Sequence, residues 1–128
     1  MVDERKESGA VLVVDDDAGI RELVKAMLSL EGFEVAVAGS DEAAMATLDT
    51  RSFDLVITDL LMPWRSGLET ISGIRGRDAR LPILAISGGG RIGVAECLHT
   101  ARCLGANATL AKPFGHRELL SQVHGLLG

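Results

Sequence analysis

The sequence predicts an α/β fold in which a doubly wound parallel sheet of five strands is covered by five helices. Five short apolar runs alternate along the chain with segments whose apolar residues recur at helical spacing. The clearest of these runs are continuous rather than alternating, which is typical of parallel strands covered on both faces. Because the connections are short and crossovers between parallel strands are right-handed, we expect helices on both faces of the sheet.

Composition indicates one globular domain and excludes several classes of protein. The chain has 128 residues, of which 47 % are hydrophobic, so it can bury one sizeable core. A net charge of −5 argues against binding nucleic acid through a basic face. The longest apolar runs of about five residues are far shorter than the roughly 20 residues that span a bilayer. Cys97 and Cys103 lack the spacing of a zinc site.

The first strand and helix follow a charged segment. Residues 1–9 lack the apolar core of a signal peptide, so we expect a flexible N-terminal tail and a cytoplasmic protein with no membrane partner. The apolar run at 10–14 is predicted to be the first strand, and three aspartates follow it. Apolar residues then recur at helical spacing from Ile20 to Leu28, and Gly32 is predicted to stop this helix.

The second strand and helix are less apolar. Residues 33–38 are predicted to be a strand, and Glu34 at its start suits a position at the edge of the sheet. Ser40 is a favourable N-cap for the next helix. The two acids that follow it stand where the helix dipole favours negative charge. This helix is expected to run to about Arg51.

The middle of the chain is predicted to hold the central strand. Residues 55–58 are predicted to be this strand, which begins with three apolar residues and stops at the carboxylate of Asp59, and a turn with proline follows. Ser66 and Glu69 have capping-box spacing ahead of the next helix. Gly73 and Gly76 are expected to keep that helix short, because glycine is unfavourable inside helices.

The last third repeats the alternation of strand and helix twice. Pro82 opens a strand predicted at 83–86, and a helix is expected over about 92–104. Residues 106–111 are predicted to be the fifth strand. The final helix has a clean apolar stripe within 119–127, as expected of a helix that packs on a sheet.

Four of the predicted strands end at polar residues. Asp15 and Asp16 follow the first strand and Asp59 follows the third. Ser87 follows the fourth strand and Lys112 follows the fifth. In a parallel sheet all strands have their carboxyl ends at one edge, where ligands bind. Each residue alone could cap a helix or face water, but together they predict one site.

This set of side chains suits phosphoryl transfer. Three neighbouring carboxylates repel one another, and a divalent cation such as Mg²⁺ relieves that repulsion. One of the carboxylates, Asp59, can then act as a nucleophile toward phosphorus. Lys112 and Ser87 can neutralise or donate to the phosphoryl oxygens, which is most of what such a reaction requires.

At this point the chain resembles the receiver domain of two-component response regulators, including the chemotaxis regulators. The residues that carry the resemblance are 13–17, Asp59, Met62, Pro63, Gly67, 86–87 and 112–114. It covers about residues 10 to 127, and we predict a receiver domain over 10–128 after the tail. The family fold is flavodoxin-like, and the resemblance implies the strand order 2-1-3-4-5.

The resemblance implies a role in phosphorelay signal transduction. Asp59 is expected to accept phosphate from a histidine kinase or a phosphotransfer protein, which makes the chain a phosphoprotein. Ser87 and Lys112 are expected to bind the phosphoryl group, and the bond between Lys112 and Pro113 is expected to be cis. The domain is then not an enzyme, since it catalyses only its own phosphorylation and dephosphorylation.

The resemblance also implies a magnesium site. Asp16 and Asp59 are expected to bind Mg²⁺ through their side chains, and Asp15 mainly through water. The backbone carbonyl of Leu61 is expected to complete the protein ligands. Mg²⁺ is therefore the expected cofactor.

One position departs from the family pattern. Many members carry an aromatic residue three positions before the lysine, whereas this chain has Thr109 there and no tyrosine at all. The aromatic part of the family's switch is therefore not expected. Instead we hypothesise that Ser87 and the glycines at 88–90 relay the signal to the next helix, because a flexible loop adjoins a phosphate contact.

Alternative functions are weighed against this interpretation. An aspartate-nucleophile phosphohydrolase of the haloacid-dehalogenase type needs an aspartate two residues after the nucleophile, where this chain has Leu61. A receiver-like interaction module that is not phosphorylated is disfavoured by the complete set of polar residues. No effector domain follows the last helix, so either a stand-alone regulator or a piece of a longer protein is expected. The expected partner downstream is a protein rather than nucleic acid, and a homodimer is left open.

Overall fold

The computed structural model describes residues 9–62, 65–87 and 105–127, without the side chains of residues 61–68. Several predictions fall outside the described residues: the helix over about 92–104, the loop at 88–90, Cys97, Cys103, and residues 1–8 of the tail. They stay predictions.

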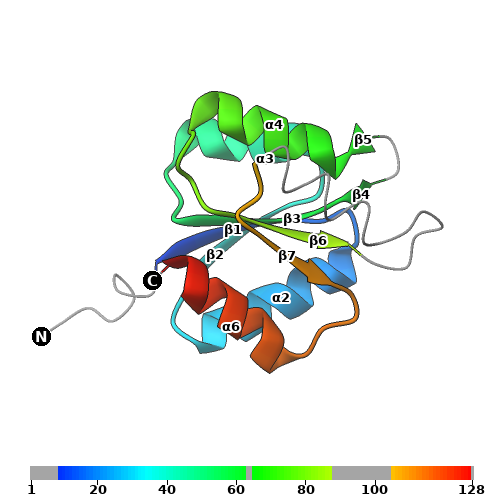
Figure 1. Ribbon diagram of the computed structural model, residues 1–128, viewed down its shortest axis with the longest axis vertical. Coiled ribbons are helices and arrows are strands. Elements are labelled where there is room, and N and C mark those ends of the chain that lie inside the picture. Colours follow the sequence, from blue (N-terminus) through cyan, green and yellow to red (C-terminus); the bar gives the residue numbers. More distant parts are fainter. Residues whose placement is uncertain (1–8, 63–64, 88–104, 128) are drawn as a thin grey trace, which may run out of the picture.

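A parallel sheet forms the centre of the molecule (Figure 1). Its strands are β1 (Ala10–Val14), β2 (Glu34–Ala38), β3 (Leu55–Asp59), β6 (Ile83–Ser87) and β7 (Ala108–Ala111). The order across the sheet is β2-β1-β3-β6-β7, and each neighbouring pair is parallel. This arrangement confirms the predicted order 2-1-3-4-5 and the flavodoxin-like, doubly wound fold. It also places β2 at the edge, where its charged first residue was expected to lie.

Helices cover both faces of the sheet (Figure 1). They are α2 (Ala18–Leu30), α3 (Asp41–Thr50), α4 (Gly67–Arg77) and α6 (His116–Leu127). Figure 1 shows α3 and α4 on one face and α2 and α6 on the other. Four helices are thus present in the described part of the chain, against five predicted, because the remaining prediction lies within residues 88–104.

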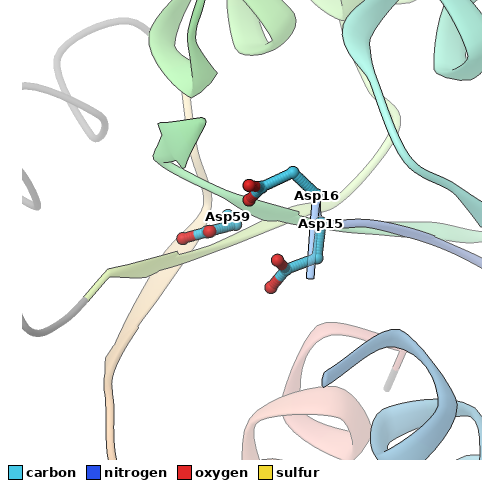
Figure 2. A group of neighbouring side chains, drawn as sticks. All are labelled: Asp15, Asp16 and Asp59. Carbon is cyan, nitrogen blue, oxygen red and sulfur yellow. The ribbon is translucent and has the colours of Figure 1, made fainter. Parts of the chain in front are cut away.

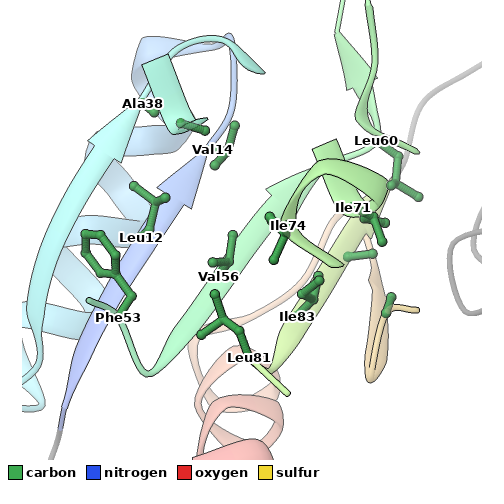
Figure 3. Packing of buried hydrophobic residues seen from close by; sticks show 13 residues of the cluster. Leu12, Val14, Ala38, Phe53, Val56, Leu60, Ile71, Ile74, Leu81 and Ile83 are labelled. Atoms are coloured by element: carbon green, nitrogen blue, oxygen red, sulfur yellow. The ribbon is translucent and has the colours of Figure 1, made fainter. Parts of the chain in front are cut away.

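The core is divided by the sheet into two apolar clusters. Leu12 and Val14 of β1 face the α3 and α4 side, where they join Ile71 and Ile74 (Figure 3). The intervening Val11 and Val13 face the opposite side with residues of α2 and α6, because successive side chains of a strand point to opposite faces. The α2 and α6 members of that cluster include Val24, Leu28, Leu119 and Val123. Strand residues buried on both faces explain why the runs in the sequence are continuous.

Short-range signals set the helix ends. The Asp17 carboxylate caps α2 by accepting from the backbone N–H groups of Gly19 at 2.8 Å and Ile20 at 3.3 Å. Gly32 has φ of 92°, a left-handed conformation that suits glycine after a helix. Ser40 caps α3 by accepting from the Ala43 N–H at 3.1 Å, as predicted.

The structure differs from the predicted elements in three places. A short antiparallel pair, β4 (Leu61–Met62) and β5 (Arg65–Ser66), forms where a turn was expected. The helix α4 has 11 residues and passes Gly73, so glycine does not shorten it. Burial of Ile71 and Ile74 against the sheet outweighs the low helix propensity of glycine. The strand β7 begins at Ala108 rather than at residue 106.

Candidate functional site

Three carboxylates meet at the carboxyl edge of the sheet (Figure 2). Asp15 and Asp16 directly follow β1, and Asp59 is the last residue of the adjacent strand β3. One oxygen from each carboxylate lies within 4.8 Å of the others. Asp15 and Asp59 are buried, whereas Asp16 is half-buried. The structure therefore confirms the prediction that these three side chains lie close together.

The three consecutive aspartates have different tasks. The Asp15 backbone N–H donates to the Ala38 carbonyl at 3.1 Å, which completes the last pair of β1 with β2, Val14 with Ala38. The Asp15 carboxylate accepts from the Asp17 N–H at 2.9 Å. Asp17 points to the helix that it caps, so only Asp15 and Asp16 face Asp59. Helix capping therefore accounts for one of the three aspartates and not for the others.

Lys112 lies between two of the carboxylates. Its Nζ is 3.3 Å from Asp15 Oδ2 and 3.6 Å from Asp59 Oδ2. Lys112 follows β7, and its backbone N–H donates to the Ser87 carbonyl at 2.8 Å, which ties it to β6. The bond from Lys112 to Pro113 is cis, as the resemblance implied. One ammonium thus offsets part of the charge of three carboxylates.

Ser87 is the last residue of β6, next to β3 in the sheet. Its side chain is buried. Among the buried side-chain nitrogen and oxygen atoms of the described residues, Ser87 Oγ is the one without a hydrogen-bond partner. A buried hydroxyl without a partner is costly, since water no longer solvates it. A ligand oxygen at this edge of the sheet would satisfy it.

The described residues fit a divalent cation with oxygen ligands. Three carboxylates and one ammonium leave an excess of negative charge in a partly buried site. Carboxylate oxygens at this separation are the ligands that Mg²⁺ or Ca²⁺ prefers. Leu61, in β4, lies two residues after Asp59, so its backbone carbonyl belongs to the segment leaving the site.

Sequence reasoning missed Arg21. This α2 residue donates from Nη1 to the backbone carbonyl of Asp15 at 2.8 Å. Arg21 lies four residues after the N-cap Asp17, about one turn into the helix, so its side chain can reach the start of the helix. This spacing was visible in the sequence, but many surface arginines have the same spacing from an N-cap.

The protein family follows from comparison with known sequences. The family model described as the response regulator receiver domain matches residues 11–124, and the chain belongs to this family. The transcriptional regulatory protein CpxR of Klebsiella pneumoniae subsp. pneumoniae (strain HS11286) is 36 % identical over 117 residues, covering 91 % of this chain and 48 % of CpxR. The transcriptional regulatory protein TrcR of Mycobacterium tuberculosis is 34 % identical over 117 residues, covering 91 % of this chain and 44 % of TrcR.

Solved structures agree with this assignment. The receiver domain of NtrX from Brucella abortus superposes with a TM-score of 0.85 at 34 % identity, covering 91 % of this chain and 97 % of that domain. The chemotaxis protein CheY4 of Vibrio cholerae superposes with a TM-score of 0.84 at 31 % identity, covering 92 % of this chain and 98 % of CheY4. The chain therefore contains a receiver domain of two-component signalling, a class of domain that is generally not enzymatic.

The curated relatives are longer than this chain, which spans about half of their length. They are named transcriptional regulatory proteins, and this does not fit the expectation of no direct contact with nucleic acid. Within the described ranges, no helix is long and apolar enough to cross a membrane.

Proposed function

We propose that Asp59 accepts a phosphoryl group, in a Mg²⁺-dependent reaction, from the phosphohistidine of a histidine kinase or a phosphotransfer protein. One observation carries the proposal: the surroundings of Asp59 at the sheet edge. Two other carboxylates lie within 4.8 Å of it and an ammonium lies at 3.6 Å. The neighbouring strand ends in a buried hydroxyl with no partner among the described residues.

Each side chain has a task in the transfer. A carboxylate oxygen of Asp59 attacks phosphorus, while the bond from phosphorus to the donor's imidazole nitrogen breaks and its electron pair stays on the imidazole. Lys112 already lies beside Asp59, so its ammonium can pair with an oxygen of the transferred group without leaving the site. Ser87 can donate its hydroxyl hydrogen to another phosphoryl oxygen and thereby gain a partner.

The metal would be bound by Asp15, Asp16, Asp59 and the backbone carbonyl of Leu61. Bound Mg²⁺ supplies charge neutralisation to the carboxylates and to the phosphoryl oxygens. The excess negative charge of the carboxylate group supports this part of the proposal.

Phosphorylation is proposed to change a protein-interaction surface through Ser87. The two phosphoryl contacts are linked across the sheet, because the Lys112 N–H donates to the Ser87 carbonyl at 2.8 Å. Ser87 also directly precedes the glycines at 88–90. Amide NMR shifts of residues 88–100 should change on phosphorylation, and unchanged shifts would contradict the relay.

Intact mass after incubation with acetyl phosphate and Mg²⁺ tests the acceptor. We expect one phosphoryl adduct on the wild type and none on Asp59→Asn. Asp49→Asn is the matched control, since this exposed aspartate lies on α3 away from the sheet edge, and it should be modified like the wild type. An adduct on Asp59→Asn would refute the assignment of the acceptor. No adduct on any variant, with Mg²⁺ still bound, would favour the interaction module that is not phosphorylated.

Further experiments test the alternative activity, the location and the partners. Hydrolysis of a generic phosphate ester by this protein would support the alternative function of an aspartate-nucleophile phosphohydrolase. That class needs a second aspartate two residues after the nucleophile, where this chain has Leu61. We propose a cytoplasmic location and a protein as the target of this domain. Nucleic-acid binding is a property to test in the whole protein, given the names of the curated relatives. A homodimer is tested by the mass of the protein in solution.

A further inference from the structure

Arg21 reaches back from α2 to the main chain of the site. Its Nη1 donates to the Asp15 carbonyl at 2.8 Å. On the other side, a Cβ added to Gly39 would lie 3.0 Å from the same Nη1. The guanidinium therefore fits between the end of β1 and the connection from β2 to α3, and Gly39 leaves the space that it occupies.

The carbonyl that Arg21 binds lies just beyond the last paired residue of β1. The sheet register of β1 ends with Val14, which pairs with Ala38 and Thr58. The peptide plane that contains the Asp15 carbonyl also contains the nitrogen of Asp16, because the peptide unit is planar. A bond to this carbonyl therefore restricts the backbone between the two carboxylates that lie close to Asp59.

We propose that Arg21 is a positioning residue of the Mg²⁺ site, and that the absence of a side chain at Gly39 gives its guanidinium room. The inference rests on the proposed function, since it concerns the affinity of that same site for the metal. Arg21 does not touch the metal or the phosphoryl group. It acts through the Asp15 carbonyl, which holds Asp16 in the direction of Asp59. The partner groups of metal ligands typically change metal affinity by about 10- to 100-fold when they are removed.

The direction of the change in Mg²⁺ affinity distinguishes a positioning role of Arg21 from an effect of its charge alone. Removing a cation near a metal site lowers electrostatic repulsion, so a pure charge effect of Arg21→Met would tighten Mg²⁺ binding. Loss of positioning would weaken it. Lys25→Met is the matched control, because Lys25 is an exposed cation one turn further along α2. It removes the same charge without a contact to the site.

Isothermal titration calorimetry with Mg²⁺ alone tests the proposal without any phosphodonor. We expect about 10-fold weaker binding for Arg21→Met, partial recovery for Arg21→Lys, and wild-type or slightly tighter binding for Lys25→Met. Gly39→Ala keeps the charge but crowds the guanidinium, because the added Cβ would lie 3.0 Å from Nη1. It should therefore weaken binding as well, but by less than Arg21→Met. The double variant Arg21→Met, Gly39→Ala should bind no more weakly than Arg21→Met, because both changes act on the same contact.

Urea unfolding in EDTA accompanies each titration and measures stability without metal. Unchanged or tighter Mg²⁺ binding by Arg21→Met, whatever its stability, would overturn the proposal and leave Arg21 a structural residue. Absence of Mg²⁺ binding by the wild type would instead refute the proposed function, and the inference with it. Weaker binding by Lys25→Met to the same degree as by Arg21→Met would also overturn it, since a residue without the contact would then have the same effect.

Discussion

Replacing Asp16 by Asn should stabilise the protein when Mg²⁺ is absent. Asp16 is the half-buried member of the carboxylate group, and an oxygen of Asp15 and one of Asp59 lie within 4.8 Å of it. Within the described part of the chain, its carboxylate makes no hydrogen bond or ion pair that the substitution would remove. Asparagine is nearly isosteric, so the main change is the loss of one negative charge.

The magnitude follows from Coulomb's law. At 4.8 Å, one pair of like charges costs about 0.9 kcal/mol in bulk water and about 3.5 kcal/mol at an effective dielectric constant of ~20. Asp16 interacts with two carboxylates but is partly solvated, and the Lys112 ammonium offsets part of the repulsion. We therefore expect Asp16→Asn to raise the free energy of unfolding in EDTA by about 1–2 kcal/mol.

Saturating Mg²⁺ should make the wild type more stable than Asp16→Asn. A ligand at about 100 times its dissociation constant stabilises a protein by about 2.7 kcal/mol, and the variant lacks one of the proposed ligands. Urea unfolding followed by circular dichroism, with EDTA and with Mg²⁺, measures both effects. Glu22→Gln is the control, because it removes an exposed acid of α2 and should change stability by less than about 0.5 kcal/mol. Lower stability of Asp16→Asn in EDTA, or an undiminished gain from Mg²⁺, would refute the reasoning.

Two further predictions concern the opposite end of the sheet. Arg75→Ala should lower the free energy of unfolding, measured by urea titration, by about 2–4 kcal/mol. The reason is that the Arg75 guanidinium makes five hydrogen bonds, including bonds to the carbonyls of Leu81 and Gly105. A loss below about 0.5 kcal/mol would show that water replaces these bonds. Gly105→Ala should be destabilising by the same measurement, since Gly105 has φ of +124° and a Cβ there would lie 2.9 Å from Arg75 Nε. Gly76→Ala is the control, because nothing lies within 4 Å of a Cβ added there, and it should leave the stability unchanged or raise it. Equal effects of the two glycine substitutions on stability would contradict the steric argument.

Local patterns were enough to predict the elements that carry the site. The apolar run 10–14 coincides with β1, and the Ser40 cap and the Gly32 stop stand where predicted. Each of these signals lies within a few residues of the feature that it specifies. Convergence of the polar residues also followed, because parallel strands have their carboxyl ends at one edge. The order of the strands did not follow from these patterns and came from the family resemblance.

The types of most elements and the residues that end the strands could therefore be predicted from local sequence. The tertiary structure was required to show which of the three consecutive aspartates caps a helix and which two face Asp59. It also showed that β4 and β5 pair, and that Arg21 meets the Asp15 carbonyl. Lys112 and Asp15 are 97 positions apart and meet at 3.3 Å. Such contacts depend on strand register and helix packing across the whole sheet, and no short window of sequence contains that information.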